Sequence, residues 1–303
     1  MSELDTPSSR LGVSSFPEEG KNSVNIAAVS VGDDIDLNER RGVIHTAFRH
    51  VINCKVNGSL VSIVTPAIGS GPNNIVVDSA DLTSLTGRER CICDLNSIDF
   101  SNARVFDSRL VIDKYGTSEF LSNLNLLEQI VINEASPLSC AFMLDERRGS
   151  FFITPFETNV RDYLRNSYSK FIDGSIEEVD ILKGVGFGLT PQGDDLISGT
   201  LIAIYVYGLM KQLPTEGLRH EIYNRARTSN EISSSFLLYA SLGRVYEKFK
   251  DLLDALAHDR ARIHDAASRF LGIGETSGAD ISTAFILSMK EFYKGGLPWL
   301  QKE

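Results

Sequence analysis

Residues 184 to 195 read Gly-Val-Gly-Phe-Gly-Leu-Thr-Pro-Gln-Gly-Asp-Asp and run directly into the apolar stretch Leu196 to Met210. That stretch is interrupted by Ser, Gly and Thr and is too short to span a membrane, so it predicts a buried helix. Four glycines in residues 184 to 193 let the backbone approach a ligand closely. The first amides of the helix then favour an anion. The simpler alternative is a tight turn that caps a core helix.

Asp194 and Asp195 at this helix start allow two interpretations. Carboxylates in a first turn can cap the helix donors, or they can bind a cation such as Mg²⁺ that bridges to a phosphate. The spacing from Gly188 to Gly193 is similar to that of a P-loop, but Asp-Asp stands where that loop needs Lys-Ser or Lys-Thr. The dinucleotide-binding pattern also fails, because its third glycine is missing from the required position.

A second stretch, residues 272 to 280, reads Gly-Ile-Gly-Glu-Thr-Ser-Gly-Ala-Asp and precedes the apolar segment Ile281 to Phe292. Both stretches follow the order Gly-x-Gly-x-Thr, then Gly, then Asp. If the two helices are parallel neighbours in the core, their starts present amides, hydroxyls and carboxylates to one pocket. The alternative is a chance repetition of a Gly-rich cap.

A third helix start, residues 227 to 235, is rich in hydroxyls and contains Asn230. Its simplest interpretation is a strong N-cap with Glu231 in the first turn. Arg225 and Arg227 just before it would supply positive charge for a phosphate or carboxylate ligand.

Apolar residues recur at helical spacing through most of the C-terminal half, beginning with Phe120 to Val131. A short strand is expected around residues 151 to 153. Further helices are expected at 157–172, 176–183, 193–211, 215–227, 231–241, 245–257, 259–271 and 278–292.

The N-terminal part has the signals of strands. Residues 50–56 and 59–64 flank Asn57-Gly58, a strong hairpin signal because both turn residues take positive φ. Further strands are expected at 75–77, 103–106 and 110–112, with a loop at Gly69 to Asn73. These strands predict a mostly antiparallel small sheet or barrel.

The fold class is therefore α+β, with a β-rich N-terminal part followed by a helical part that contains two buried helices begun by glycine. Three regions are expected along the chain. They are a flexible N-terminus at 1–20, a β-rich domain at 21–115 and a mainly helical domain at 116–303 that carries the Gly-rich motifs.

Composition excludes several classes of protein. The chain has 303 residues, 42% of them hydrophobic, and a formal net charge of −10. It is too apolar for a disordered protein, and its acidic balance argues against a nucleic-acid binder. Its four cysteines form no disulfide framework and are expected to be buried thiols, and the histidines lack metal-ligand spacing. With no signal peptide and no membrane span expected, we predict a cytoplasmic protein.

In their order along the chain, the three Gly-rich and hydroxyl-rich helix starts resemble the signature of the AllH-like family. That family was long classed as a domain of unknown function, and some members are labelled putative carboxylase. It includes a subunit of the oxamate carbamoyltransferase of allantoin catabolism, a branch of purine breakdown. The resemblance covers most of the chain, including the Gly71-Pro72-Asn73 loop.

The resemblance implies a site made by all three motifs. It implies catalytic roles for Asp194, Asp195 and Asp280, with Asp194 and Asp195 as candidate ligands of Mg²⁺; no other cofactor is evident. It implies substrate binding by Gly186, Gly188, Thr190, Gly193, Asn230, Ser233, Gly274, Ser277 and Gly278. Three positions depart from the family pattern: Phe187 stands where Pro is common, Gln192 where Ser is common, and Glu275 where His is expected. The last removes a candidate acid or base and is expected to place another carboxylate near the pocket.

Three functions fit these residues. The first is a carbamoyltransferase subunit that takes carbamoyl phosphate and a small amide acid such as oxamate, and binds the anion at the Gly-rich helix starts. The second is a non-catalytic subunit that binds a small anion or serves as a scaffold. The third is a carboxylase or hydrolase. The expected partners are a small anionic substrate and either other protein subunits or further copies of this chain, with no nucleic acid and no membrane.

Overall fold

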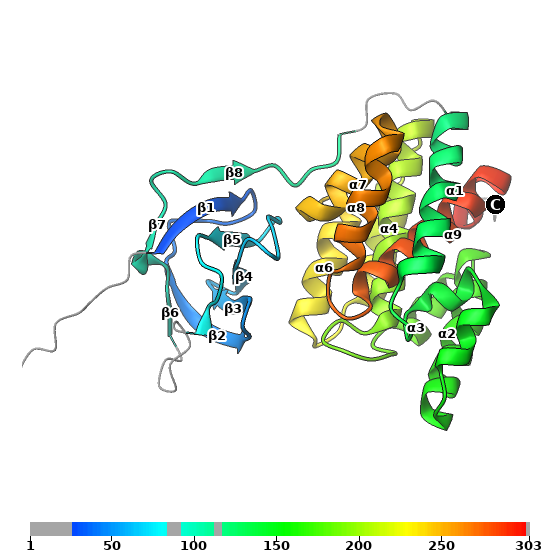
Figure 1. Ribbon diagram of the computed structural model, residues 1–303, viewed down its shortest axis with the longest axis horizontal. Helices are drawn as coiled ribbons and strands as arrows, with labels where there is room; N and C mark the ends of the chain where they lie inside the picture. The colour runs from blue at the N-terminus through cyan, green and yellow to red at the C-terminus, as the bar shows by residue number, and fades with distance from the viewer. Residues whose placement is uncertain (1–25, 84–91, 112–116, 301–303) are drawn as a thin grey trace, which may run out of the picture.

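The computed structural model describes residues 26–83, 92–111 and 117–300 (Figure 1). A mixed sheet formed by the N-terminal strands lies beside a helical part formed by the rest of the chain. The predicted α+β fold is therefore confirmed. The N-terminus expected to be flexible, residues 1–20, lies outside the described residues.

Within the described residues, the sheet has eight strands, seven of them in the order β6-β2-β3-β4-β5-β1-β7 and the eighth, β8, paired to β1. Most neighbours are antiparallel, but β4 with β5, β1 with β7 and β1 with β8 are parallel. The strands are β1 (Ile26–Gly32), β2 (Arg41–Ala47), β3 (Val51–Val56), β4 (Ser59–Val64), β5 (Asn74–Val77), β6 (Ile92–Asp94), β7 (Ile98–Asp99) and β8 (Arg104–Phe106).

The Asn57-Gly58 turn joins β3 to β4 as predicted. Asn57 has a φ of 47° and Gly58 a φ of 80°, and Val56 pairs with Ser59 across the turn. Because successive side chains alternate between the faces of a strand, β3 and β4 contribute side chains to both faces of the sheet. Ile52 and Ile63 belong to the sheet's own apolar core, whereas the alternate positions face the helical part.

The helical part follows the sequence pattern closely. Its helices are α1 (Thr117–Glu134), α2 (Pro155–Ile172), α3 (Val179–Leu182), α4 (Gln192–Lys211), α5 (Glu216–Ala226), α6 (Glu231–Ser241), α7 (Glu247–His258), α8 (Ile263–Leu271) and α9 (Ser277–Gly295). Short 3₁₀ turns cover 95–97, 140–143, 146–151, 176–178, 260–262 and 298–300.

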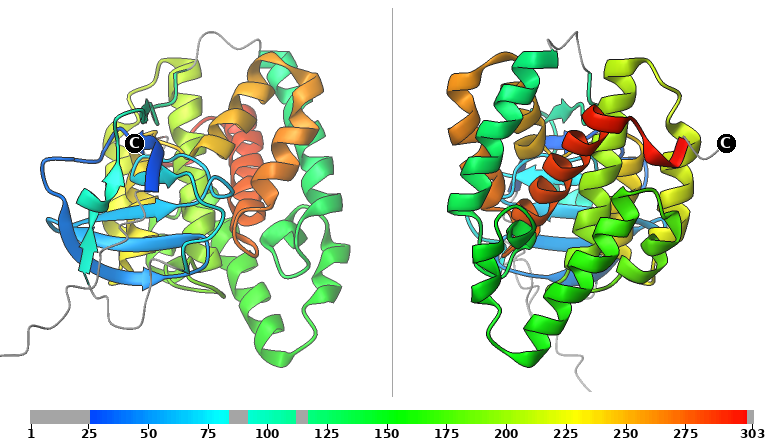
Figure 2. Two further views of the ribbon diagram at one scale, coloured as in Figure 1. Left: turned by 60° about the vertical axis from the view of Figure 1, so that its left-hand side comes forward. Right: turned by 90° about the vertical axis from the view of Figure 1, so that its right-hand side faces the viewer.

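Helices α4 and α9 run side by side in the helical core (Figure 2). They are parallel, because Thr190 meets Ser277 at their starts and Tyr207 meets Phe292 near their ends. The two backbones come close where a Cβ added at Gly199 would lie 2.4 Å from the Ile281 carbonyl oxygen. The condition for one shared pocket, that the two helices begun by glycine are parallel neighbours, is therefore met.

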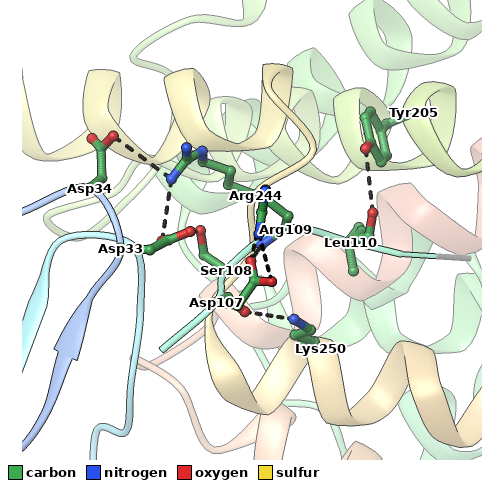
Figure 3. Close-up of polar contacts among 9 residues, drawn as sticks. All are labelled: Asp33, Asp34, Asp107, Ser108, Arg109, Leu110, Tyr205, Arg244 and Lys250. Carbon is green, nitrogen blue, oxygen red and sulfur yellow. Dashed lines mark hydrogen bonds and ion pairs between the residues drawn. The ribbon is translucent and has the colours of Figure 1, made fainter. Parts of the chain in front are cut away.

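The sheet and the helical part are joined along a seam formed by residues 107–111 and 243–245 (Figure 3). The Leu110 amide donates to the Gly243 carbonyl at 3.0 Å, and the Val245 amide donates to the Ser108 carbonyl at 2.9 Å. Between these two bonds, Arg109 and Arg244 form a β-bridge.

Side chains extend the seam into the turn that follows β1. The Arg244 guanidinium lies 3.2 Å from Asp33 and 3.7 Å from Asp34, and Ser108 donates to Asp33 at 2.7 Å (Figure 3). Lys250 on α7 donates to the Asp107 carbonyl at 2.6 Å. The sheet is therefore fixed to the helical part at several points.

Two strand predictions were wrong. Residues 110 and 111 are not in a strand, because Leu110 pairs with a loop of the helical part, and residue 112 lies outside the described residues. Residues 151 to 153 are not a strand either: Phe151 ends a 3₁₀ turn, and Thr154 then caps α2 by accepting from the Glu157 amide at 3.2 Å. In the described part of the chain, no helix has the length and apolarity needed to cross a membrane.

Candidate functional site

The loop before α4 needs its glycines for its own geometry. Gly184, Gly186 and Gly188 have φ values of 74°, 119° and 89°, in the region that residues with a Cβ rarely adopt. A Cβ at Gly193 would lie only 1.9 Å from the Leu182 carbonyl oxygen. The loop therefore folds back tightly on the start of the helix.

The start of α9 is built in the same way. Gly274 has a φ of 62°, and a Cβ at Gly278 would lie 2.1 Å from the Phe270 carbonyl oxygen. In both motifs, the glycine inside the first turn lets the helix start pack against the carbonyl of a residue in the last turn of an earlier helix. The similar sequences therefore have similar structures.

Most amides of the two helix starts already have acceptors. The Gly193 amide donates to the Val185 carbonyl at 2.8 Å, and the amides of Asp194 and Asp195 donate to the Pro191 carbonyl. The amides of Gly278 and Asp280 are likewise bonded within their own loop. Within the described residues, the amides at these starts with no acceptor are those of Gln192, Ser277 and Ala279.

Hydroxyl groups join the two Gly-rich motifs. Thr190 Oγ1 lies 2.8 Å from Ser277 Oγ, and Thr190 also donates to Asp195 Oδ2 at 3.3 Å. The third predicted motif reaches the same loop, because Asn230 donates to the Leu189 carbonyl at 2.8 Å. All three sequence motifs therefore meet at one place.

Asp194 and Asp195 are adjacent in sequence but have different partners. Asp194 accepts from the Gly184 amide at 2.8 Å, whereas Asp195 faces Thr190. Burial raises the pKa of Asp194, and the bond from Gly184 and the nearby Ser233 hydroxyl partly offset this rise. Asp194 thus stabilises the loop, while Asp195 belongs to the hydroxyl cluster.

Asp195 lies beside a second buried carboxyl group, that of Asp280. Burial, followed by the negative charge of Asp280, raises the pKa of Asp195 well above its ordinary value. Hydrogen bonds from Ser277 and Thr190 partly offset the rise. Burial also raises the pKa of Asp280 to about 7, although the Cys140 amide donates to it at 2.5 Å. Burial therefore favours the protonated form of each carboxyl group relative to an exposed aspartate.

Cys140 and Gln192 complete this buried cluster. Cys140 is fully buried, and burial followed by the charge of Asp280 raises the pKa of its thiol. Gln192 donates to the Leu138 carbonyl at 2.8 Å and lies beside Asp280. In the described structure, Gln192 Oε1 and Asp280 Oδ2 are buried without a hydrogen-bond donor. A proton on Asp280 would supply one.

Sequence reasoning missed Cys140 as part of the site. It treated the residue as an ordinary buried thiol, and Cys140 lies 52 positions before Gln192, the first residue of α4. Gln192 was noticed only as a departure from the family pattern. The pattern gave no sign that a side chain at the first position of α4 points into the core, where Gln192 is fully buried.

A cavity of about 320 Å³ lies between the sheet and the helical part, with the hydroxyl cluster in its wall. Four of the predicted site residues line it: Thr190, Asp195, Gly274 and Ser277. The lining does not include the other predicted residues, which are Gly186, Gly188, Gly193, Asp194, Asn230, Ser233, Gly278 and Asp280. Glu275, expected to bring another carboxylate near the pocket, is exposed and not part of the lining, although the adjacent Gly274 lines the cavity.

The structure offers no ready cluster of metal ligands. Among the residues described, no three His, Cys, Asp or Glu side chains are placed to hold a metal ion. Asp194 and Asp195, the predicted Mg²⁺ ligands, accept hydrogen bonds from Gly184 and Thr190 respectively. Any cation at the cavity would therefore depend on Asp195 and on oxygen atoms of its ligand.

Comparison with known proteins gives two matches, which together cover most of the chain. Residues 182–289 match the family model described as oxamate carbamoyltransferase subunit AllH. Residues 26–113 match the model of the AllH family N-terminal domain. No solved structure matches this chain significantly. The first match contains all three motifs that meet at the cavity.

Proposed function

The chain belongs to the AllH family of oxamate carbamoyltransferase subunits, and on that premise we propose that it supplies the small-substrate site of a carbamoyltransferase. The proposed substrates are carbamoyl phosphate and a small amide acid such as oxamate, and the reaction takes place with the other subunits of the complex. The observation that carries the proposal is the meeting of Thr190, Asp195 and Ser277 in the wall of one cavity.

The reaction needs little covalent chemistry from the protein. The amide nitrogen of the acceptor attacks the carbamoyl carbon, the bond from that carbon to the phosphate oxygen breaks, phosphate leaves, and the nitrogen loses one proton. The protein must hold the two substrates together and stabilise the charge on the leaving phosphate. The amides of Ser277 and Ala279 are the donors proposed for this anion, and the hydroxyls of Thr190 and Ser277 are proposed to hold the amide group of the acceptor.

Asp195 is proposed to accept the proton from the attacking nitrogen. A carboxyl group with a raised pKa is suited to proton transfer near neutral pH, because its ordinary pKa makes it too weak a base. Asp280 lies beside Asp195, and burial raises its pKa as well. Because both carboxyl groups resist ionisation, the pair carries less negative charge than two exposed aspartates would. Asp194, which is bonded to the loop, is proposed to hold Gly184 in place.

The test is carbamoyl transfer by the complete complex. Asp195→Asn is expected to lower kcat by at least a hundredfold, since it removes the base and keeps the shape. Asp162→Asn, at an exposed carboxylate on α2, is the matched control and should leave kcat unchanged. Full transfer by Asp195→Asn would refute the catalytic role. Assays with and without Mg²⁺ show whether a cation takes part.

A non-catalytic role is the second candidate. The observation that favours it is that most amides of both helix starts are bonded within their own loops, as a purely structural cap requires. In that case the chain binds carbamoyl phosphate or phosphate, and Asp195→Asn changes that affinity without changing kcat of the complex.

A further inference from the structure

The wall of the 320 Å³ cavity is mainly apolar. Its side chains come from β3 and β4, from the loop after β4, and from α4, α6, α7 and α9. The principal apolar members are Val51, Leu60, Ile68, Ile202, Ile232 and Phe249. Two very small, highly polar substrates would leave most of this wall in contact with water, which apolar surface disfavours.

The polar side chains on the sheet side of the wall are already bonded to protein. Ser62 donates to Asn53 at 2.7 Å, and Asn53 donates in turn to Thr46. Asn73 donates to the Leu60 carbonyl at 3.0 Å and accepts from Tyr246 at 2.9 Å. This side of the cavity therefore offers little to a polar ligand.

The two basic side chains in the wall also have partners. Arg244 lies against Asp33 and Asp34 in the seam, and Lys248 donates to the Ala67 carbonyl at 2.6 Å. A carboxylate at the polar end of the cavity, where Thr190, Asp195 and Ser277 lie, would meet the carboxyl group of Asp195. A neutral head group suits this end better.

Each hydrogen-bonding group of a primary amide has a possible partner at the polar end of the cavity. Thr190 and Ser277 each have a hydroxyl that can donate and accept, and Asp195 adds carboxyl oxygens that accept from N–H. The amide carbonyl can accept from a hydroxyl while the NH₂ group faces Asp195. The NH₂ group is then the nitrogen that would attack a carbamoyl group.

We propose that this cavity binds a primary amide with an apolar substituent, holding the amide at Thr190, Asp195 and Ser277 and the substituent against the apolar wall. The claim that such an amide binds in the cavity is independent of the proposed function. The further claim that it accepts the carbamoyl group rests on the proposed function. An apolar cavity of about 150 Å³ is enough to bind benzene, so a cavity of 320 Å³ accommodates a substituent of about six carbons.

The test is the affinity of the purified full-length chain for acetamide, butanamide and hexanamide, measured by calorimetry. Each buried methylene contributes about fourfold in affinity, so hexanamide should bind about 10- to 15-fold more tightly than butanamide. Hexanoate, the matched carboxylate, should bind more weakly than hexanamide. The proposal would be overturned if affinity did not change with the number of carbons in the amide, or if hexanoate bound more tightly than hexanamide.

Two substitutions locate the binding. Ala67→Phe fills the cavity from an exposed loop position and should abolish the gain from butanamide to hexanamide; Ile68→Trp is a second filling variant on the same loop. Ala261→Phe, at an exposed position outside the lining, should change nothing. An unchanged gain in both filling variants would place the amide elsewhere and refute the proposal.

The outcome separates this inference from the proposed function. If affinity rises with the number of carbons in the amide but the complex transfers no carbamoyl group to any amide, the ligand class is supported and the proposed reaction is refuted. If transfer to oxamate proceeds while affinity is flat along the series, the reaction stands and the ligand class falls.

Discussion

The hydroxyl oxygens of Thr190 and Ser277 lie 2.8 Å apart, although 87 residues separate them in the sequence. Each hydroxyl stands just before or at the start of a buried helix, and the two helices are parallel neighbours. This contact therefore fixes the position of the two helices relative to each other along their axes. It also places two groups that can donate or accept hydrogen bonds at one point of the cavity wall.

Removing these hydroxyls tests whether they bind substrate. Thr190→Val and Ser277→Ala are each expected to weaken binding of oxamate by about 2- to 10-fold, the usual contribution of a hydrogen bond between neutral groups. Ser150→Ala, at an exposed serine of a 3₁₀ turn, is the control. Calorimetry on the full chain measures the effect. Unchanged affinity in both variants would mean that the hydroxyls serve only the helix contact.

The pKa of Asp280, raised to about 7 by burial, predicts how stability depends on pH. The folded state binds a proton that the unfolded state releases near pH 4, so this group stabilises the fold at low pH and the contribution is lost as pH rises through 7. Asp280→Asn should remove this dependence. The decrease in unfolding free energy between pH 4 and pH 8 should then be about 2–4 kcal/mol smaller than in the wild-type chain.

Chemical denaturation at several pH values measures that change. Asp251→Asn is a useful comparison, because burial raises the pKa of this half-exposed carboxyl group less strongly and its effect should be small. Parallel curves for the wild-type chain and Asp280→Asn would contradict a raised pKa at this position.

The glycines inside the first helix turns are predicted to be essential for stability. Gly193→Ala and Gly278→Ala would bring a Cβ within about 2 Å of a backbone carbonyl, so each should lower the unfolding free energy by about 3 kcal/mol or more. Gly217→Ala is the matched control, since it lies in α5 with nothing within 4 Å of the added Cβ. That variant should gain stability, by about 0.5–1 kcal/mol.

Thermal or chemical unfolding of the three glycine variants decides the matter. If Gly193→Ala and Gly278→Ala were as stable as Gly217→Ala, the close approach of both helix starts to the preceding carbonyls would be wrong.

The ion pair of the seam is predicted to be energetically coupled. The side chains of Arg244 and Asp33 are only 23% and 16% exposed, so solvent screens them little. A double-mutant cycle with Arg244→Met and Asp33→Asn should give a coupling energy of about 1–3 kcal/mol in unfolding experiments. The exposed pair of Arg41 and Asp94 should give about 0.5 kcal/mol or less. Equal coupling in the two pairs would contradict a partly buried seam.

Much of the fold could be predicted because its signals are local. The Asn57-Gly58 turn, the apolar stretch of α4 and the similar start of α9 each depend on residues that are neighbours in sequence. The parallel pairing of β1 with β7 and β8 depends on residues about seventy positions apart, which no local pattern reports. Leu110 looked like part of a strand because Leu-Val-Ile is apolar, yet its amide pairs with the Gly243 loop.

The candidate site was predicted in part for the same reason. Similarity between the two Gly-rich stretches indicated that the two helix starts would present groups to one pocket, but it could not show that Asp194 and Asp195 have different partners. The orientation of adjacent side chains on a helix depends on which elements surround it. Cys140 was missed because only the folded chain brings its 3₁₀ turn against Asp280.

The hydrogen bonds of Ser108 and Leu110 to the far half of the chain have a consequence for how this family can be dissected. The stretch that matches the N-terminal family model runs to residue 113, so it contains one edge of the seam and leaves Gly243 and Val245 on the other side. A fragment cut at that boundary would lose partners on both sides of the cut. We therefore expect that neither matched stretch, expressed alone, keeps the seam contacts of the full chain.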